Sequence, residues 1–202
     1  MAHLDNLFYD TYTSYEAKVQ PDDPLMNTFN PTQLQASYYN PDTDGWCGYC
    51  CLAWISLDVP SVVADGCGII MKQLLLSTLI EHEDNFKTYF ASDYDVIKST
   101  LECSPDKTTD WWFIVPDFLW IASIAFKQSF LLFMTDFEKP VLIQHPHAPL
   151  PSMISLFFFI DDQLGHGHFK VYKVSQFQMD SAVACVTQDF FNTCFQDLAT
   201  IQ

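Results

Sequence analysis

The stretch DGWCGYCCLAW, residues 44–54, decides how the whole chain is interpreted. Read from Cys47, it contains Cys-x-x-Cys, the spacing of a redox dithiol. Read from Asp44, it is Asp-Gly-x-Cys followed by an apolar helix, an arrangement that presents one cysteine as a nucleophile at a helix N-terminus. The two interpretations make different demands on the fold. A dithiol needs a strand directly before it, and a nucleophile needs a histidine from another part of the chain.

The residues before Cys47 favour the nucleophile. The segment SYYNPDTDG, residues 37–45, is rich in turn-forming residues and predicts a loop, whereas a redox dithiol follows an apolar strand. A zinc site is less favoured still, because Cys47, Cys50 and Cys51 form one group and no second pair of cysteines stands at ligand spacing. We therefore expect no metal and no cofactor. A thiol oxidoreductase that uses Cys47 and Cys50 stays as an alternative.

The composition predicts one folded domain with an acidic surface. The chain has 202 residues, 49% of them hydrophobic, which is enough to bury a sizeable core. We expect a single domain, 1–202, with an N-terminal arm at 1–43, a core at 44–174 and a C-terminal extension at 175–202. Nine basic against 25 acidic residues give a formal charge of −16. This charge disfavours nucleic acid or an anionic membrane surface as partner and favours a basic one.

No targeting or membrane segment is expected. The N-terminus has no basic segment followed by an apolar one, as a secretory signal would have. The most apolar region, Trp111–Met134, is interrupted by Pro116-Asp117 and Lys127-Gln128, and leaves no run near the ~20 apolar residues of a membrane helix. We expect a cytoplasmic protein without a disulfide framework.

Hydrophobic periodicity predicts an α+β fold with a helical first half and a small, mostly antiparallel C-terminal sheet. Residues 1–43 predict an arm and a loop. Helices are expected at 48–57, 68–90, 93–101 and 116–126. Short apolar or alternating runs predict strands at 129–134, 140–145, 153–161 and 168–174.

A nucleophilic Cys47 requires a base, and the last predicted strand offers two histidines. His166 and His168 open this strand in LGHGHFKVYKV, where the flanking glycines allow close approach of a substrate chain. Residues two apart lie on one face of a strand, so the pattern alone does not separate them.

Several segments together resemble one family, the ovarian tumour (OTU) deubiquitinating cysteine proteases. Asp44-Gly45-Trp46-Cys47 is similar to its Asp-Gly-Asn-Cys nucleophile motif. The segment MKQLLLSTLIEHEDNFKTYFASDYDVI is similar to its next helix and Asp-Tyr segment, DWWFIVPDFLWIASIAF to its Trp-then-acidic helix, and GHGHFKVY to its closing Gly-His-aromatic strand. The resemblance covers about residues 41–173 in the family's order.

The resemblance implies a role for each matching residue. Cys47 is the nucleophile, His168 is the general base because the aromatic Phe169 follows it, and Asp44 is the acid whose loop shapes the oxyanion hole. Trp46, Gly167 and Phe169 are the implied substrate-binding residues. The implied activity is that of a monomeric thiol isopeptidase that cleaves after the C-terminal glycine of ubiquitin or a ubiquitin-like modifier.

The chain departs from the family pattern at three places. Trp46 replaces the usual Asn, Trp112-Phe113 replaces a glycine-rich step, and Lys170 stands where the family has an Asn or Asp that orients the histidine. An ammonium group only donates, so Lys170 cannot accept the imidazole N–H. We expect a backbone carbonyl or an Asp from the N-terminal arm to take this role, or else a poorly oriented base.

The third departure has two further implications. Viral members of the family resemble this chain in tolerating loss of the orienting residue, which favours a virus-encoded domain acting in the host cytosol. A catalytically silent OTU-like module that binds ubiquitin is the other alternative.

Overall fold

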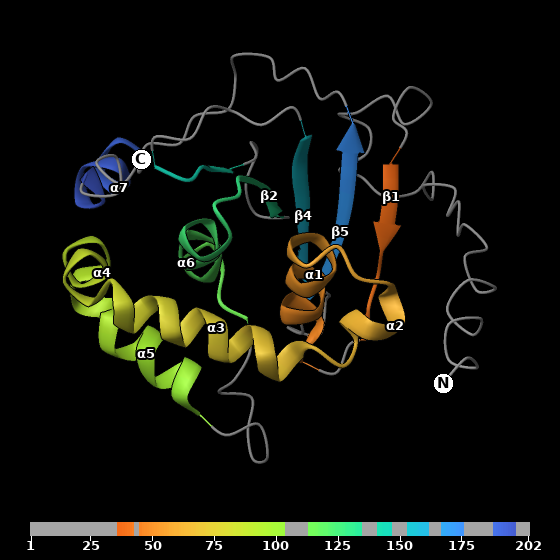
Figure 1. The fold of residues 1–202 in the computed structure, drawn as a ribbon, viewed down its shortest axis with the longest axis horizontal. Coiled ribbons are helices and arrows are strands. Elements are labelled where there is room, and N and C mark those ends of the chain that lie inside the picture. The colour runs from red at the N-terminus through yellow and green to blue at the C-terminus, as the bar shows by residue number, and fades with distance from the viewer. Residues whose placement is uncertain are drawn as a thin grey trace, which may run out of the picture.

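A computed structural model of the chain describes residues 36–42, 45–103, 113–134, 141–146, 153–161, 167–175 and 188–196. Within these ranges the fold is α+β, as predicted, with helices gathered beside one five-stranded sheet (Figure 1). The part of the chain described has no helix that is both long and apolar enough to cross a membrane.

The sheet combines one strand from the N-terminal arm with four from the second half of the chain. Its order is β1-β5-β4-β2-β3, and the β2–β4 pair is parallel while the other three pairs are antiparallel. The strands are β1 (Ala36–Tyr39), β2 (Phe130–Met134), β3 (Val141–Ile143), β4 (Met153–Asp161) and β5 (Gly167–Ser175). The four predicted C-terminal strands are therefore confirmed. The prediction of a loop at residues 36–39 was wrong, because this short segment pairs with β5.

The helices are stacked outward from the sheet. Helix α1 packs on β5, α3 runs across α1 and α6, and α5 packs on α3 (Figure 1). The α-helices are α1 (Cys47–Ser56), α2 (Ser61–Ala64), α3 (Gly68–Glu81), α4 (Glu83–Phe90), α5 (Tyr94–Glu102), α6 (Asp117–Phe126) and α7 (Gln188–Cys194), and a 3₁₀ turn, η3 (Ala91–Asp93), precedes α5. The long helix predicted at 68–90 is two helices, because the backbone of His82 leaves the helical conformation.

Aromatic side chains join the C-terminal helix α7 to the rest of the core. Phe191 contacts Tyr89, with ring centroids 4.7 Å apart, and Phe195 contacts Phe86 at 4.8 Å. Phe191 and Phe195 are fully buried. Each such aromatic contact adds about 1 kcal/mol beyond the burial of area. Part of the C-terminal extension therefore completes the helical side of the domain.

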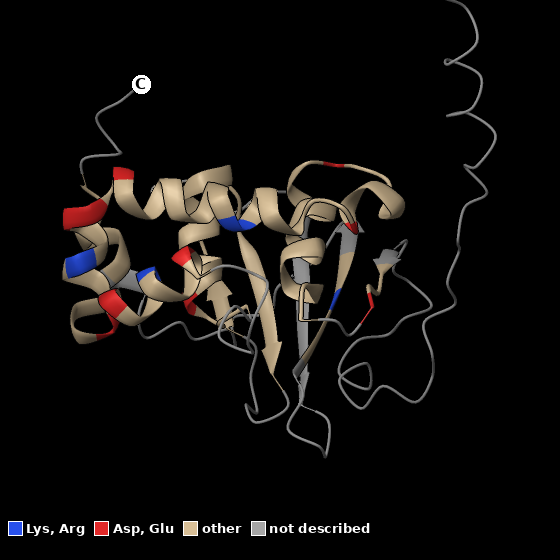
Figure 2. Cartoon of the chain, turned by 90° about the horizontal axis from the view of Figure 1, so that it is seen from below, with Lys and Arg blue, Asp and Glu red and all other residues tan. Residues whose placement is uncertain are grey.

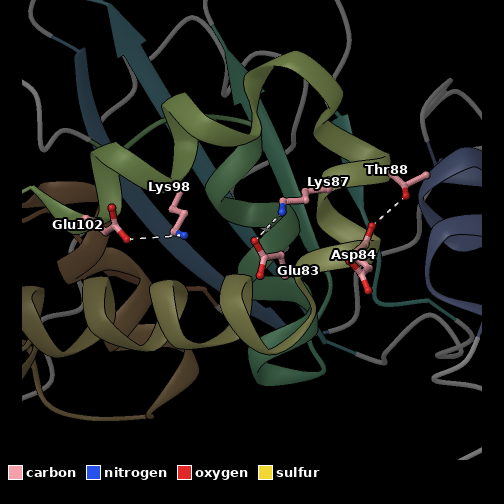
Figure 3. A network of polar contacts seen from close by, with 6 residues as sticks. All are labelled: Glu83, Asp84, Lys87, Thr88, Lys98 and Glu102. Carbon is pink, nitrogen blue, oxygen red and sulfur yellow. Dashed lines mark hydrogen bonds and ion pairs between the residues drawn. The ribbon is translucent and has the colours of Figure 1, made fainter.

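Ion pairs on α4 and α5 lie at the surface and contribute little to stability. Lys87 pairs with Glu83 at 2.7 Å and Lys98 with Glu102 at 4.0 Å, each four residues apart on one helix (Figure 3). Exposed pairs of this kind stabilise a helix only slightly, because solvent screens both charges and the two long side chains lose conformational freedom. The helices are held mainly by their buried apolar faces.

Asp117, the first residue of α6, should make stability depend on pH. Burial, and then the charge of Asp93, raise the pKa of Asp117 to about 6 from an ordinary value near 3.8. Between these values the native state holds the proton more tightly than the unfolded state, so stability falls as the pH rises through this window. We expect the Asp117→Asn variant to be more stable than the parent by about 3 kcal/mol at neutral pH, an advantage that disappears below the window.

Urea unfolding at a series of pH values measures this difference. Asp95→Asn is the matched control, because Asp95 lies in the first turn of α5 and is exposed. An Asp117→Asn variant whose stability follows the parent at every pH would contradict the assignment.

Candidate active site

Cys47 lies at the start of a helix that is buried on every side. It is the first residue of α1, its exposed fraction is 3%, and every α1 residue from Cys47 to Ile55 is buried. A helix that is apolar all round belongs in a core, which explains this position. The first N–H groups of a helix have no acceptor within the helix and carry its positive dipole end. A thiolate or an oxyanion is stabilised there.

The two neighbouring cysteines are engaged elsewhere. The Cys50 thiol donates to the backbone carbonyl of Asp65 at 3.7 Å, and the Cys51 thiol donates to the carbonyl of Phe169 at 3.5 Å. Burial, and then the proximity of Cys47, raise the pKa of Cys51 well above its usual value. Cys51 is therefore a protonated thiol, and the three cysteines are chemically distinct.

The end of β1 and the starts of β5 and α1 lie at the same end of the sheet, beside Cys47 (Figure 1). Strand β1 ends at Tyr39, β5 begins at Gly167, and the two strands are antiparallel, with Tyr39 opposite Val171. Helix α1 starts at this same end of the sheet, at the lower edge in Figure 1. The Cys51 contact with Phe169 fixes α1 along β5, one helical turn after Cys47 and one residue after His168.

The imidazole of His168 is held by the side chain that directly follows β1. Its Nε2 lies 2.6 Å from Oδ1 of Asn40. An amide oxygen only accepts, so Nε2 carries the proton and Nδ1 of the neutral ring keeps its lone pair. Nδ1 is buried and has no hydrogen-bond partner in the described part of the chain. The ring therefore presents an unprotonated nitrogen, as a general base requires.

The environment of His168 favours the neutral ring. Burial lowers the pKa of His168, and the positive charge of Lys170, two residues along the strand, lowers it further. Lys170 therefore acts on the charge state of His168. The acceptor expected from the N-terminal arm is present, and it is an Asn instead of the Asp considered from the sequence.

A second set of contacts fixes the end of β1 that carries Asn40. The Tyr39 hydroxyl donates to Oδ1 of Asp65, in the turn between α2 and α3, and its ring stacks on Trp54 of α1 at 5.6 Å. Asp65 also accepts the Cys50 thiol through its carbonyl. One turn thus ties β1 and α1 together, which sets the position of Asn40 relative to Cys47.

Phe113 packs against both α1 and β5, the elements that carry Cys47 and His168. A Cβ at Gly48 would lie 2.4 Å from Phe113, so the ring occupies the space left by the missing side chain of Gly48. Phe113 also contacts Phe169 edge-on, with centroids 5.4 Å apart. The exposed fraction of Phe169 is 3%, and its side chain is therefore used for packing. The part in substrate binding that the resemblance implies for Phe169 remains a prediction.

The other predicted site residues lie as follows. Trp46 precedes α1 and is partly buried, because its indole covers Gly68 at the start of α3. Gly167 is the first residue of β5, beside His168. Asp44 and His166 lie outside the described residues. The structure thus brings together the ends of the elements that carry Cys47 and His168.

Asn40 is the site residue that the sequence interpretation missed. It lies in the segment predicted as a loop, 128 residues before His168. The alternation and apolar character of residues 36–39 were the only sign of a strand ending there, and four residues are too few to distinguish a strand from a turn-rich arm.

Comparisons with protein-family models, with curated proteins and with solved structures find no match for this chain.

Asn40 should control the tautomer of His168. We expect ¹⁵N NMR, recorded well above the ordinary histidine pKa of about 6.5, to show the Nε2–H form of His168 in the parent. Asn40→Ala removes the acceptor and should give a mixture of tautomers, whereas Asn40→Asp retains the acceptor and the Nε2–H form. Asn85→Ala on α4 is the control. Equal spectra for the parent and Asn40→Ala would show that Asn40 does not hold the ring.

Lys170 should set the protonation of His168. Removing its charge in Lys170→Ala is expected to raise the pKa of His168 towards the ordinary value, so that the ring becomes protonated at higher pH than in the parent. NMR titration of the His168 ring measures the shift. Lys98→Ala on α5 should leave it unchanged. A His168 pKa that is lower in Lys170→Ala than in the parent would contradict the assigned repulsion between Lys170 and the protonated ring.

Proposed function

We propose that the protein is a thiol isopeptidase that cleaves after the C-terminal glycine of ubiquitin or a ubiquitin-like modifier. The observation that carries the proposal is the orientation of the His168 ring. Asn40 holds the ring through Nε2, and Nδ1 has no hydrogen-bond partner in the described part of the chain. His168 lies near the start of β5, and Cys47 lies at the start of α1, which packs on that strand. A cysteine at a helix N-terminus and an oriented neutral histidine are the two parts of a cysteine hydrolase. The resemblance to the OTU family supplies the substrate.

The proposed reaction uses these groups in sequence. Nδ1 of His168 takes the proton of the Cys47 thiol, and the thiolate attacks the glycine carbonyl. The oxyanion that forms is stabilised by backbone N–H groups at the start of α1. The His168 imidazolium then protonates the departing lysine amine as the C–N bond breaks, and Asn40 keeps the ring in position throughout. A water molecule then gives a proton to His168 and attacks the thioester carbonyl; the C–S bond breaks, the carboxylate product is released, and the Cys47 sulfur takes the proton back from His168.

The cysteine contacts favour this reaction over a dithiol exchange. The Cys50 thiol is turned towards Asp65 of the α2–α3 turn, to whose backbone carbonyl it donates. A strand does precede the motif, but residues 40–46 separate β1 from α1, whereas a redox dithiol directly follows its strand.

The charge of the chain suits ubiquitin as a partner. Acidic residues outnumber basic ones by 25 to 9, and Figure 2 shows acidic residues on several of the described helices. An acidic surface attracts a basic partner and speeds its association. The charge favours a basic substrate in general, and ubiquitin as that substrate comes from the resemblance to the OTU family.

Ubiquitin carrying a C-terminal electrophile tests the proposal. We expect the parent to form a covalent adduct, Cys47→Ser to form none and Cys50→Ser to retain most of the labelling, because thioester chemistry needs one nucleophile. Mass spectrometry of the adduct identifies the labelled residue. An unlabelled but folded parent would favour a silent ubiquitin-binding module, and equal loss in Cys47→Ser and Cys50→Ser would favour the dithiol.

Turnover of a fluorogenic ubiquitin substrate then separates the base from its neighbours. His168→Ala should lose nearly all turnover, whereas His166→Ala should lose less than about tenfold, or about 1.4 kcal/mol of barrier. Lys170→Ala should stay within about threefold, or about 0.7 kcal/mol, since Asn40 holds the ring. A hundredfold loss in a folded Lys170→Ala variant would contradict this assignment.

A further inference from the structure

Large apolar side chains are exposed together on α2, on the start of α3 and just before them. Their exposed fractions lie between 37% and 79%, although single exposed apolar residues are normal on any protein. We call this surface the α2–α3 patch, formed by Leu57, Val62, Val63, Ile69, Ile70 and Leu74. Of the remaining large apolar residues found exposed, Ile80 lies farther along α3 and Val96 on α5.

The patch residues lie close together along the chain, on two helices joined by a short turn and on the residue that directly follows α1. A tight turn joins α2 to α3, closed by hydrogen bonds from Gly66 to Val63 and from Cys67 to Ala64, and α2 lies beside the N-terminal end of α3 in Figure 1. Ile70 and Leu74 are four residues apart and so lie on one face of α3. Contiguous apolar surface of this kind marks interaction sites.

The charges around the patch are acidic. Asp58 and Asp65 are exposed, and the one cationic residue between positions 57 and 74 is Lys72. Lys72 is 4% exposed, and its ammonium group has no hydrogen-bond partner in the described part of the chain. It therefore presents no charge at the surface. The patch offers an apolar centre with a negative border.

This border determines what kind of partner fits. A second copy of the chain would bring the same negative border and be repelled. No other segment of the chain is strongly basic, since its nine basic residues are all lysines, spread from Lys18 to Lys173. We propose that the α2–α3 patch binds a different protein or peptide, one that presents apolar side chains bordered by lysine or arginine.

A designed peptide tests the proposal without reference to catalysis. The probe is a helix of about 14 residues, four turns, built of leucine on one face and lysine on the other, and its control has glutamate in place of lysine. We expect calorimetry to detect binding of the lysine peptide to the full chain and not of the glutamate peptide. NMR shift changes should lie at residues 57–74. No binding of the lysine peptide would overturn the proposal.

Matched variants separate the patch from the general attraction of an acidic chain for a cationic peptide. Ile70→Ser/Leu74→Ser keeps the net charge and should weaken binding more than about tenfold, or about 1.4 kcal/mol. Val96→Ser, at an apolar position on α5 that is more exposed than either of these residues, should stay within about twofold. Asp58→Asn should weaken binding and reduce its dependence on salt.

Two results would contradict the proposal. Equal effects of Ile70→Ser/Leu74→Ser and Val96→Ser in folded proteins would assign the binding to charge alone. Binding of the parent to neutral lipid vesicles, lost in Ile70→Ser/Leu74→Ser while peptide binding is unchanged, would assign the patch to a membrane surface. Both results rest on direct measurements of binding. They would therefore stay valid even if Cys47 had no isopeptidase activity.

Discussion

The close packing of Phe113 against Gly48 is the contact on which the arrangement of the site depends. With any larger residue at position 48, a Cβ would stand 2.4 Å from the ring, so α1 would have to move away. The same ring contacts Tyr49 of α1, Phe118 of α6 and Phe169 of β5 edge-on, with centroids 5.1–5.4 Å apart. One aromatic side chain therefore sets the distance between the helix that carries Cys47 and the strand that carries His168.

The orientation of His168 illustrates how a fold compensates for an unsuitable neighbour. A residue two positions along the same strand would be the nearest acceptor, but Lys170 stands there and can only donate. Asn40 reaches the ring from the position directly after the paired strand β1, and Tyr39 fixes the end of that strand through Asp65. The acceptor and the charge that adjusts the pKa of His168 are thus separate residues, which allows each to be changed alone.

The turn between α2 and α3 connects the site with the exposed apolar surface. Asp65 of this turn accepts from Tyr39 and from Cys50, and Trp46, the residue before Cys47, covers Gly68 at the start of α3. Ile69 and Ile70 follow Gly68 directly and are half exposed. A partner bound at the α2–α3 patch would therefore lie against the same turn that positions β1 and α1.

The sequence by itself determined the local features: the apolar helix after Cys47, the helix from Asp117 and the four C-terminal strands, because hydrophobic periodicity and turn residues act over short distances. Only the tertiary structure decided that residues 36–39 form an edge strand, that Asn40 meets His168 across 128 residues of sequence, and that Lys72 is buried while Ile70 is exposed. Each of these depends on strand register or helix rotation. Both are fixed by packing between distant segments, which a local pattern does not contain.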